Sequence, residues 1–410
     1  MAKAAAHRLG ILSTPQKNAA LLRIAELLEQ EADGLRAVNE RDLAEGRAAG
    51  LDPYFLDRLR LNPANVAADT RGVAALPDPI GQTIEGRTLD NGIRLSKRRV
   101  PIGVIGCIYE ARPNVTVDIA ALALKSGNAA VLRGGKEAKH TNRALGELIQ
   151  RALADTGVPG DAVQVVSDPD RAHVEELLKA NDLIDLVVPR GGEALIAHVR
   201  ANATMPVVAH GEAVVHVYVD AGADLEMALE IVDNAKTRRY SICNAVDTVL
   251  VHVDIAPRFL AALAKRWAGS VTMIAGERAL ALLAGGNGTA LQVERATDAT
   301  WRMEHLALRA GIKLVDSIDE AVEHIERYGS HHSDAIVTND YAAATRFVDE
   351  VDSAVVYVNA STQYTDGAQF GLGAEVGIST QKMHARGPMG LVELTSYKWI
   401  AMGTGQVRPA

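Results

Sequence analysis

Short apolar runs alternate with amphipathic stretches through the middle of the chain. Four of the runs, "VPIGVIGCIYE", "AAVLRGG", "AVQVVSD" and "IDLVVPRGG", have the length of buried strands. Each run precedes a stretch of helical period, such as "VTVDIAALALKSG", which ends in Gly127, and His140–Thr156. Strand–helix units in this order predict a parallel, doubly wound sheet.

A second series of the same kind begins near Ala213. Its strand-like runs are "VVHVYVD", "TVLVHVD", "GIKLVDS", "DAIVTND" and "AVVYVNA". We therefore expect an α/β fold with two doubly wound parallel-sheet domains. The N-terminal part is helical instead, with Thr14 as the expected cap, Pro15 at the first helical position and a second helix over Leu35–Arg47.

Residues 84–100 follow a third pattern. "IEGRTLDNGIRLSKRRV" alternates loosely and contains Asn91-Gly92, a strong turn signal for a β-hairpin. The closing stretch "LVELTSYKWI" is strand-like, and it can pair either with this hairpin or with another subunit. The hairpin and the tail are expected to form a small β element.

Composition narrows the function classes. The length of 410 residues allows two or three domains. A formal net charge of −8 argues against a nucleic-acid or anionic-membrane surface. Two cysteines cannot build a disulfide framework, and neither a signal peptide nor a long apolar span is evident. We therefore expect a cytoplasmic protein whose ligand is a small molecule.

Glycine pairs follow two of the predicted strands. "RGGKEA" and "PRGGEA" both lie where a strand ends and a helix begins, a position at which backbone N–H groups can bind phosphate. Arg133, Lys136 and Arg190 add positive charge. Ordinary tight strand-to-helix turns with solvated charges would, however, give the same sequence pattern. Neither G-x-G-x-x-G nor a complete P-loop is present after a predicted strand.

The two cysteines lie in different contexts. Cys107 is inside an apolar strand and is expected to be a buried filler. Cys243 falls in the loop between a predicted helix and the strand "TVLVHVD", after Lys236, Arg238 and Arg239. A positive field lowers the pKa of a thiol, so Cys243 is a candidate nucleophile as well as a candidate inert residue.

Histidines give no metal motif. The densest cluster, "EHIERYGSHHSD", contains no H-E-x-x-H and no cysteine partner, so we expect no metal site. A Cys–His hydrolase stays open as an alternative, although no local motif supports it.

Several long strings resemble a known family. They include "VPIGVIGCIYEARPNVTVD", "DLVVPRGGEALI", "CNAVDTVLVH" and "FGLGAEVGISTQKMHARGPMGLVELTSYKW". Together they resemble the gamma-glutamyl phosphate reductase family of the aldehyde dehydrogenase superfamily. The resemblance implies a cofactor-binding domain over residues 1–83 and 101–212, a catalytic domain over residues 213–387 and an oligomerisation element over residues 84–100 and 388–410.

The family chemistry implied by the resemblance is the reduction of L-glutamyl 5-phosphate by NADPH to glutamate 5-semialdehyde and phosphate, in proline biosynthesis. Cys243 matches the nucleophile that forms a thioester, and Asn114 matches the asparagine that stabilises the oxyanion together with the Cys243 N–H. The implied partners are further copies of the chain, as a dimer or tetramer, and glutamate 5-kinase, which makes the labile acyl phosphate.

The same resemblance implies binding residues. Arg133 and Lys136 would lie near the adenosine ribose and its phosphate, Gly191-Gly192 near the pyrophosphate, and Glu304 near the nicotinamide ribose. Substrate contacts are expected from Arg112, Ser361 and Thr362.

This chain departs from the family at three positions. Gln363 replaces the usual arginine of "NASTRF", Asp247 replaces a glutamate and Tyr240 a proline. If the arginine binds substrate anions, their affinity is weaker here. Two alternatives stay open: a related acyl-phosphate or CoA-linked semialdehyde dehydrogenase, and a nucleotide-binding scaffold without catalysis.

Overall fold

The chain forms two compact units in the computed structural model, which describes residues 1–168, 170–209, 211, 213–284 and 291–408. Unit 1 comprises Met1–Ala209, Gly371–Gly377 and Met389–Ala410. Unit 2 comprises His210–Phe370 and Ile378–Pro388. The cofactor-binding and catalytic roles expected for the two halves of the chain stay predictions.

A parallel four-stranded sheet is the centre of unit 1 in its described residues, with the strand order β5-β4-β3-β6. The strands are β3 (Val104–Tyr109), β4 (Ala129–Gly134), β5 (Val163–Val165) and β6 (Leu186–Arg190). Every residue of β3 is buried, as expected for a central strand covered on both faces. The parallel sheet predicted from the strand–helix series is therefore confirmed.

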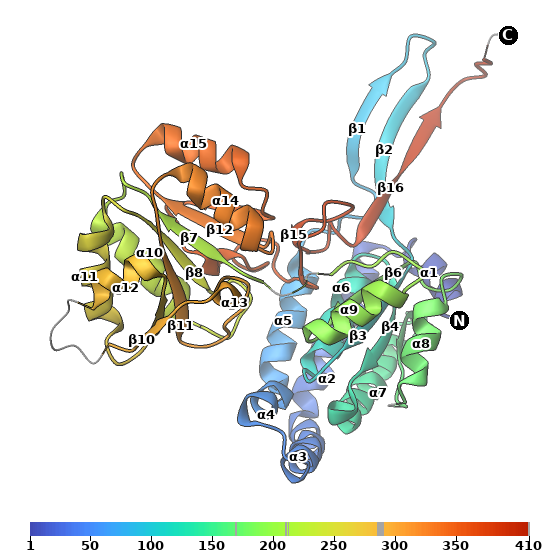
Figure 1. Cartoon of the computed structure of the whole chain (residues 1–410). Helices are drawn as coiled ribbons and strands as arrows, with labels where there is room; N and C mark the ends of the chain where they lie inside the picture. The colour runs from blue at the N-terminus through green and yellow to red at the C-terminus, as the bar shows by residue number, and fades with distance from the viewer. Residues whose placement is uncertain (169, 210, 212, 285–290, 409–410) are drawn as a thin grey trace. The chain divides into compact units, whose positions relative to one another are not determined.

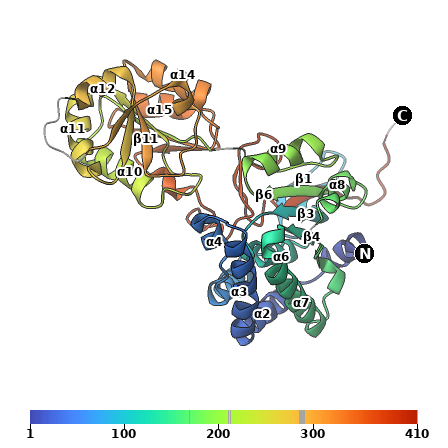
Figure 2. The same ribbon diagram turned by 60° about the horizontal axis from the view of Figure 1, so that its bottom comes forward.

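Helices cover both faces of this sheet. They are α1 (Ala2–Leu9), α2 (Thr14–Gln30), α3 (Ala32–Ala48), α4 (Pro53–Leu59), α5 (Pro63–Ala75), α6 (Asn114–Lys125), α7 (Lys139–Asp155), α8 (Ala172–Lys179) and α9 (Glu193–Asn202), with the 3-10 turns η1 (Lys136–Ala138) and η2 (Gly160–Ala162). Figure 2 shows α8 and α9 on one side of the strands, and α6 and α7 on the other, backed by α2 and α3. As predicted, Gly127 follows the end of α6, with a φ of 74° that favours glycine.

The N-terminal segment differs from the prediction in two respects. Helix α1 precedes the helix that begins at Thr14, and the sequence pattern did not indicate it. The cap of α2 is Ser13, whose N–H donates to Gln16 Oε1 at 3.0 Å as part of a capping box. The Thr14 hydroxyl donates instead to Asp78 Oδ2 at 2.9 Å, so Thr14 is the first helical residue and not the cap.

The predicted hairpin and the tail strand form one antiparallel sheet. Its strands are β1 (Thr83–Thr88), β2 (Arg94–Pro101) and β16 (Thr395–Met402), in the order β1-β2-β16. Figure 1 shows the three strands side by side. The hairpin is confirmed, and β16 pairs with β2 over its whole length, from Thr395 opposite Pro101 to Met402 opposite Arg94.

Unit 2 contains a parallel sheet of seven strands in its described residues, in the order β10-β9-β11-β8-β7-β12-β13. The strands are β7 (His216–Val219), β8 (Thr248–His252), β9 (Thr272–Ala275), β10 (Val293–Arg295), β11 (Arg309–Val315), β12 (Ser333–Val337) and β13 (Val355–Val358). The second doubly wound sheet is confirmed. Strands β9 and β10 were not among the predicted runs.

Two apolar cores lie on opposite faces of this sheet. The helices of unit 2 are α10 (Leu225–Thr237), α11 (Ala256–Trp267), α12 (Glu277–Leu283), α13 (Asp298–Trp301), α14 (Ile318–Tyr328) and α15 (Tyr341–Glu350). Val217 and Val219 of β7 face the core formed by α10, α11 and α12, whereas Tyr218 faces that of α14 and α15. No helix in the described part of the chain is long and apolar enough to cross a membrane.

The long C-terminal string that begins at Phe370 is mostly irregular before β16. Up to that strand it contains the short antiparallel pair β14 (Ile378–Ser379) and β15 (Gly387–Pro388), and a 3-10 turn η3 (Thr362–Tyr364) lies before it. These elements hold loops in place and do not extend either large sheet.

Candidate active site

Cys243 lies in a turn between α10 and β8, as predicted, and its side chain is half-buried. Cys107, in the centre of β3, is fully buried, and burial raises the pKa of its thiol to about 12. A thiol in that environment stays protonated and inert at neutral pH. The expected assignment of Cys107 as a filler is confirmed, and Cys243 is the thiol that solvent can reach.

A segment from far along the chain braces the Cys243 turn. The Thr362 hydroxyl donates to the backbone carbonyl of Asn244 at 2.7 Å. The Asn244 amide nitrogen, in turn, donates to the carbonyl of Thr365 at 3.0 Å and to that of Gln363 at 3.3 Å. Asn244 is 4% exposed, so these bonds are shielded from water. We call residues 361–365 the brace.

Gln363 fastens the residues that lead into the Cys243 turn. Its amide nitrogen donates to the carbonyls of Ala235 at 2.9 Å and Arg239 at 3.1 Å. Its amide oxygen accepts from Arg238 Nη1 at 3.0 Å, and the side chain is only 5% exposed. Through Gln363, the brace is therefore linked to the end of α10. The sequence pattern did not indicate this role.

Ser361 and Thr362, predicted as substrate contacts, both lie in the brace. Thr362 is completely buried, and its hydroxyl is engaged by Asn244. The Ser361 oxygen accepts from the backbone N–H of Gln363 at 3.3 Å. The structure thus brings both residues to the Cys243 turn, while their contact with substrate stays a prediction.

Glu304 lies in a segment, residues 302–308, that is tied to the same region of unit 2. The N–H of the next residue, His305, donates to Asp247 Oδ1 at 2.8 Å, and Asp247 follows the Cys243 turn. Lys236 of α10 donates to the carbonyl of Ala307 at 3.3 Å. Asp247 and Lys236 therefore join the segment that carries Glu304 to the loop that carries Cys243.

The charges around this junction are buried. Burial raises the pKa of Asp247 to about 6, and Lys236 opposes that shift. Burial lowers the pKa of Lys236, while Asp247 and Glu304 act to raise it. Burial also lowers the pKa of His305 to about 4, so this histidine is neutral near pH 7. Lys236 and Asp247 are opposite charges in one buried neighbourhood, where each favours the ionised form of the other.

Asn114, in unit 1, is the first residue of α6 and follows a tight turn. Its amide nitrogen donates to Asp118 Oδ2 at 2.8 Å, one helical turn along. Burial, together with the nearby Asp69, raises the pKa of Asp118 to about 7. Asp118 was not among the predicted site residues, although a spacing of four on a helix could have indicated the pair.

The residues predicted to bind adenosine phosphate follow β4. Arg133 is almost buried near the end of the strand, and one of its Nη atoms donates to the carbonyl of Asp170 at 3.3 Å. Burial lowers the pKa of Arg133, but a guanidinium keeps its charge at neutral pH. Lys136 begins the turn η1 and is exposed. The structure therefore places one buried, hydrogen-bonded cation and one exposed cation at this end of β4.

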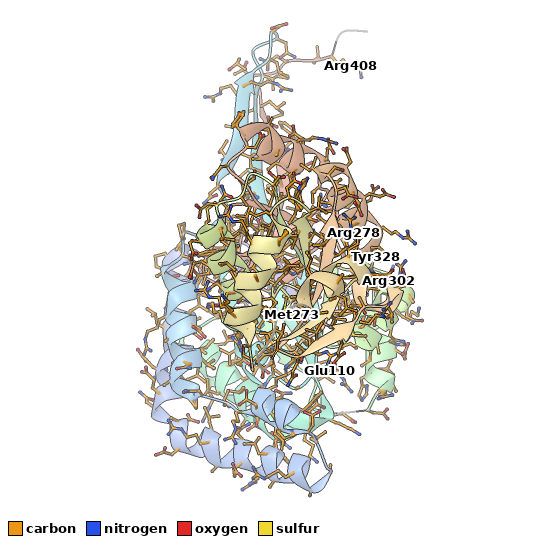
Figure 3. All side chains as sticks on the ribbon, turned by 60° about the vertical axis from the view of Figure 1, so that its left-hand side comes forward. Glu110, Met273, Arg278, Arg302, Tyr328 and Arg408 are labelled. Carbon is orange, nitrogen blue, oxygen red and sulfur yellow. The ribbon has the colours of Figure 1, made fainter. Side chains whose placement is uncertain are left out.

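Gly191 and Gly192 follow β6 and are exposed, with Gly192 as the N-cap of the ten-residue helix α9. The Gly192 N–H donates to Glu110 Oε2 at 3.0 Å. Glu110, labelled in Figure 3, directly follows β3. Exposed glycines at the N-terminus of α9, and the cations Arg133 and Lys136 after β4 on the other side of β3, are groups of the kind that bind the phosphates of a dinucleotide, although Glu110 already accepts the Gly192 N–H.

Fold and site together define an aldehyde dehydrogenase: residues 1–278 match the aldehyde dehydrogenase family. Gamma-glutamyl phosphate reductase of Dehalococcoides mccartyi is 52% identical over 412 residues, which cover 100% of this chain and 97% of that protein. The crystal structure of gamma-glutamyl phosphate reductase from Thermotoga maritima has a TM-score of 0.95 at 42% identity, covering 100% of this chain and 98% of that one. The chain belongs to the gamma-glutamyl phosphate reductases, which are oxidoreductases of this family.

Membership of the aldehyde dehydrogenase family implies a nicotinamide cofactor. A more distant structure, an engineered glycolyl-CoA reductase with bound NADP+, has a TM-score of 0.69 at 18% identity and covers 98% of this chain and 95% of its own. At that identity the likeness concerns the fold alone. The aldehyde dehydrogenase-like α/β fold expected from the sequence is confirmed.

Proposed function

We propose that the chain catalyses the NADPH-dependent reduction of L-glutamyl 5-phosphate to L-glutamate 5-semialdehyde and phosphate, the second step of proline biosynthesis. Full-length relatives from Dehalococcoides mccartyi and an Enterobacter species, each 52% identical, support the reaction by their names. The observation that carries the proposal is Cys243, a half-buried thiol on a turn that buried hydrogen bonds hold in place.

Cys243 is the nucleophile of this reaction. Its thiolate attacks the acyl carbon, a C–S bond forms, and the C–O bond to phosphate breaks as phosphate leaves with the electron pair. When bound, the nicotinamide cofactor supplies the hydride that reduces the resulting thioester. The tetrahedral intermediate then collapses, the C–S bond breaks, and the thiolate is regenerated as the aldehyde leaves.

Asn114 and the Cys243 N–H stabilise the negative charge that develops on the substrate oxygen. An amide nitrogen carries two hydrogens, and Asp118 accepts one of those on Asn114. This bond to Asp118 restricts the rotation of the Asn114 side chain, and the second amide hydrogen of Asn114 stays available to the substrate oxygen. Loss of one such donor typically costs ~100-fold or more in rate.

The remaining predicted residues bind the ligands. Arg133, Lys136, Gly191 and Gly192 hold the phosphates and adenosine ribose of the cofactor, and Glu304 holds the nicotinamide ribose. Residues 1–83 and 101–212 thus form the cofactor-binding domain, and residues 213–387 form the catalytic domain, which also supplies Glu304 to the cofactor. Arg112, Ser361 and Thr362 contact the amino acid end of the substrate or its phosphate.

A second copy of the chain is the expected partner. The β1-β2-β16 sheet exposes large apolar side chains on β16: Tyr397 at 51%, Trp399 at 46% and Met402 at 58%. Aromatic residues of this size are enriched at protein interfaces. Light scattering after gel filtration tests this, since a monomer would contradict it. Association with glutamate 5-kinase stays a prediction.

The reverse reaction tests the chemistry directly. Glutamate 5-semialdehyde, phosphate and NADP+ are mixed with the wild type or with Cys243→Ala, and the absorbance of reduced cofactor is followed. We expect phosphate-dependent reduction of NADP+ that is lost in Cys243→Ala, while both proteins bind NADPH equally well. The phosphate dependence separates an acyl-phosphate reductase from a hydrolytic aldehyde dehydrogenase.

Two results would point elsewhere. Stoichiometric NADPH binding without turnover would favour a scaffold, and turnover only with coenzyme A in place of phosphate would favour a CoA-linked dehydrogenase. NADH replacing NADPH at equal efficiency would contradict the cofactor preference and leave the acyl chemistry in place.

A further inference from the structure

In unit 1, a glutamate side chain connects each of the two glycine-pair turns to the same short turn by a hydrogen bond. Glu137, in "RGGKEA", accepts a hydrogen bond from the Ala111 N–H at 2.6 Å. Glu110, on the other side, accepts from the Gly192 N–H of "PRGGEA" at 3.0 Å. Residues 110–114, which we call the asparagine turn, therefore connect to both loops that are predicted to hold the dinucleotide, and they end at Asn114.

The asparagine turn has a strained backbone. Ala111 has a φ of 56°, in the left-handed region that non-glycine residues disfavour, and it is buried. The Arg112 N–H donates to the Glu110 carbonyl at 2.7 Å, which tightens the chain around Ala111. A strained conformation of this kind persists only where its surroundings hold it. The Glu137 carboxylate is the side chain that takes the Ala111 N–H.

Glycine makes room for each carboxylate. A Cβ at position 135 would overlap the Glu137 carboxylate, and one at position 191 would overlap that of Glu110. The glycine pairs, which the sequence alone links only to phosphate, thus have a second use. They allow the loops to close over the glutamates of their own chain.

We propose that Glu137 and Glu110 are positioning residues that couple the two predicted dinucleotide loops to the placement of Asn114. Glu137 holds Ala111, and through it the start of α6, against the loop that carries Lys136. Glu110 fixes the same turn to the N-terminus of α9. The inference rests on the proposed function for the role of Asn114, but the linkage itself concerns only the fold of unit 1.

The two glutamates act as hydrogen-bond acceptors, so the amide of glutamine should replace each of them in part. Alanine cannot, and the Ala111 N–H then loses its acceptor while the left-handed backbone remains costly. Glycine at position 111 removes that cost, because glycine adopts positive φ readily. The expected order of damage is therefore Glu137→Ala first, then the double variant Glu137→Ala/Ala111→Gly, then Glu137→Gln.

The test compares these variants and Glu110→Gln with the wild type. Glu147→Ala, which removes an exposed carboxylate of α7 paired with Arg143, is the matched control. Three quantities are measured: amide hydrogen exchange in the peptide that contains Ala111, the affinity for NADPH by fluorescence, and kcat and KM separately. The first two do not depend on turnover.

For Glu137→Ala we expect exchange at residues 111–116 to be at least about tenfold faster, because local opening exposes these amides. We expect kcat to fall about tenfold or more through misplacement of Asn114, with a smaller change in KM for glutamyl phosphate. Glu137→Gln and Glu110→Gln should stay within about threefold of wild type. Recovery of kcat in the double variant would support the linkage through Ala111.

The linkage is overturned if Glu137→Ala leaves both the exchange and kcat at the level of the Glu147→Ala control. Equal loss in Glu137→Gln and Glu137→Ala would overturn the hydrogen-bond role in favour of charge. If the wild type lacks reductase turnover, the proposed function fails, and the exchange and NADPH-binding data still decide the linkage. Should Glu137→Ala not fold, Glu137→Gln and Ala111→Gly carry the same comparison.

Discussion

The hydroxyl of Thr362 donates to the backbone carbonyl of Asn244 at 2.7 Å, although the two residues lie 118 positions apart in the chain. Asn244 follows Cys243 directly, so this bond fixes the backbone next to the proposed nucleophile. The Asn244 side chain donates two more hydrogen bonds to backbone carbonyls of the brace. The turn that presents the thiol is thus held by a separate segment as well as by its own Ala245 N–H, which donates to the Ile242 carbonyl at 3.1 Å.

Removal of the Thr362 hydroxyl should weaken this turn. For Thr362→Val we expect a loss of about 1–3 kcal/mol in the free energy of unfolding, because the buried Asn244 carbonyl loses a donor. We also expect a lower kcat, since the thiol is less well placed. Urea denaturation and steady-state kinetics measure the two effects. Thr345→Val is the control, because the Thr345 hydroxyl donates a similar bond to a backbone carbonyl at an exposed position of helix α15. Equal effects of the two variants would contradict the role of the brace.

Gln363→Arg tests what the family's usual arginine would do in this chain. We expect destabilisation of at least about 2 kcal/mol, because an arginine has no acceptor to offer Arg238 and adds a second positive charge in a site that is 5% exposed. Gln369→Arg, at an exposed position nearby, should be close to neutral. A stable Gln363→Arg variant with tighter substrate binding would instead mean that position 363 recognises an anion.

The two thiols should differ sharply in reactivity. At about pH 8 iodoacetamide should modify the native chain once, at Cys243, because Cys107 is fully buried and burial raises the pKa of its thiol to about 12. Mass spectrometry of the intact protein counts the additions. We expect none in native Cys243→Ala and two in the denatured wild type. Modification of Cys107 in the native state would contradict the burial of β3.

Asp118 should make stability depend on pH. Burial, with Asp69 nearby, raises its pKa from 3.8 to about 7 in the folded chain. A raised folded pKa means that the stability is fully present below the unfolded pKa and is lost as the pH rises through the folded value. Wild type should therefore lose stability between about pH 4 and 7 relative to Asp118→Asn, which keeps an oxygen acceptor for Asn114.

Chemical denaturation at several pH values across this range measures the difference between Asp118→Asn and wild type. The difference should grow with pH and favour the asparagine variant at the alkaline end. Asp33→Asn, at a side chain that is 98% exposed, is the control for the loss of a surface carboxylate. A difference between Asp118→Asn and wild type that stays constant across this range would contradict the raised pKa of Asp118.

Much of the fold could be predicted because its signals are local. Each buried strand of unit 1 is a continuous apolar run, and each crossover helix has its own period, so the parallel sheet followed from pattern alone. The hairpin followed from Asn91-Gly92 in the same way. Helix α1 and strands β9 and β10 were missed because each is short: α1 has eight residues, β9 has four and β10 has three.

The same distinction between local signals and long-range contacts applies to the candidate site. The sequence by itself determined which thiol lies in a loop, which turns carry glycine pairs and which family the long motifs resemble. Only the tertiary structure decided that β16 pairs with β2, that Gln363 links α10 to the brace, and that Glu137 holds Ala111. The physical reason is that these contacts join a side chain or strand edge to backbone groups far away in the chain. Such contacts leave no periodic pattern, because any segment that folding brings within hydrogen-bonding distance can supply the partner.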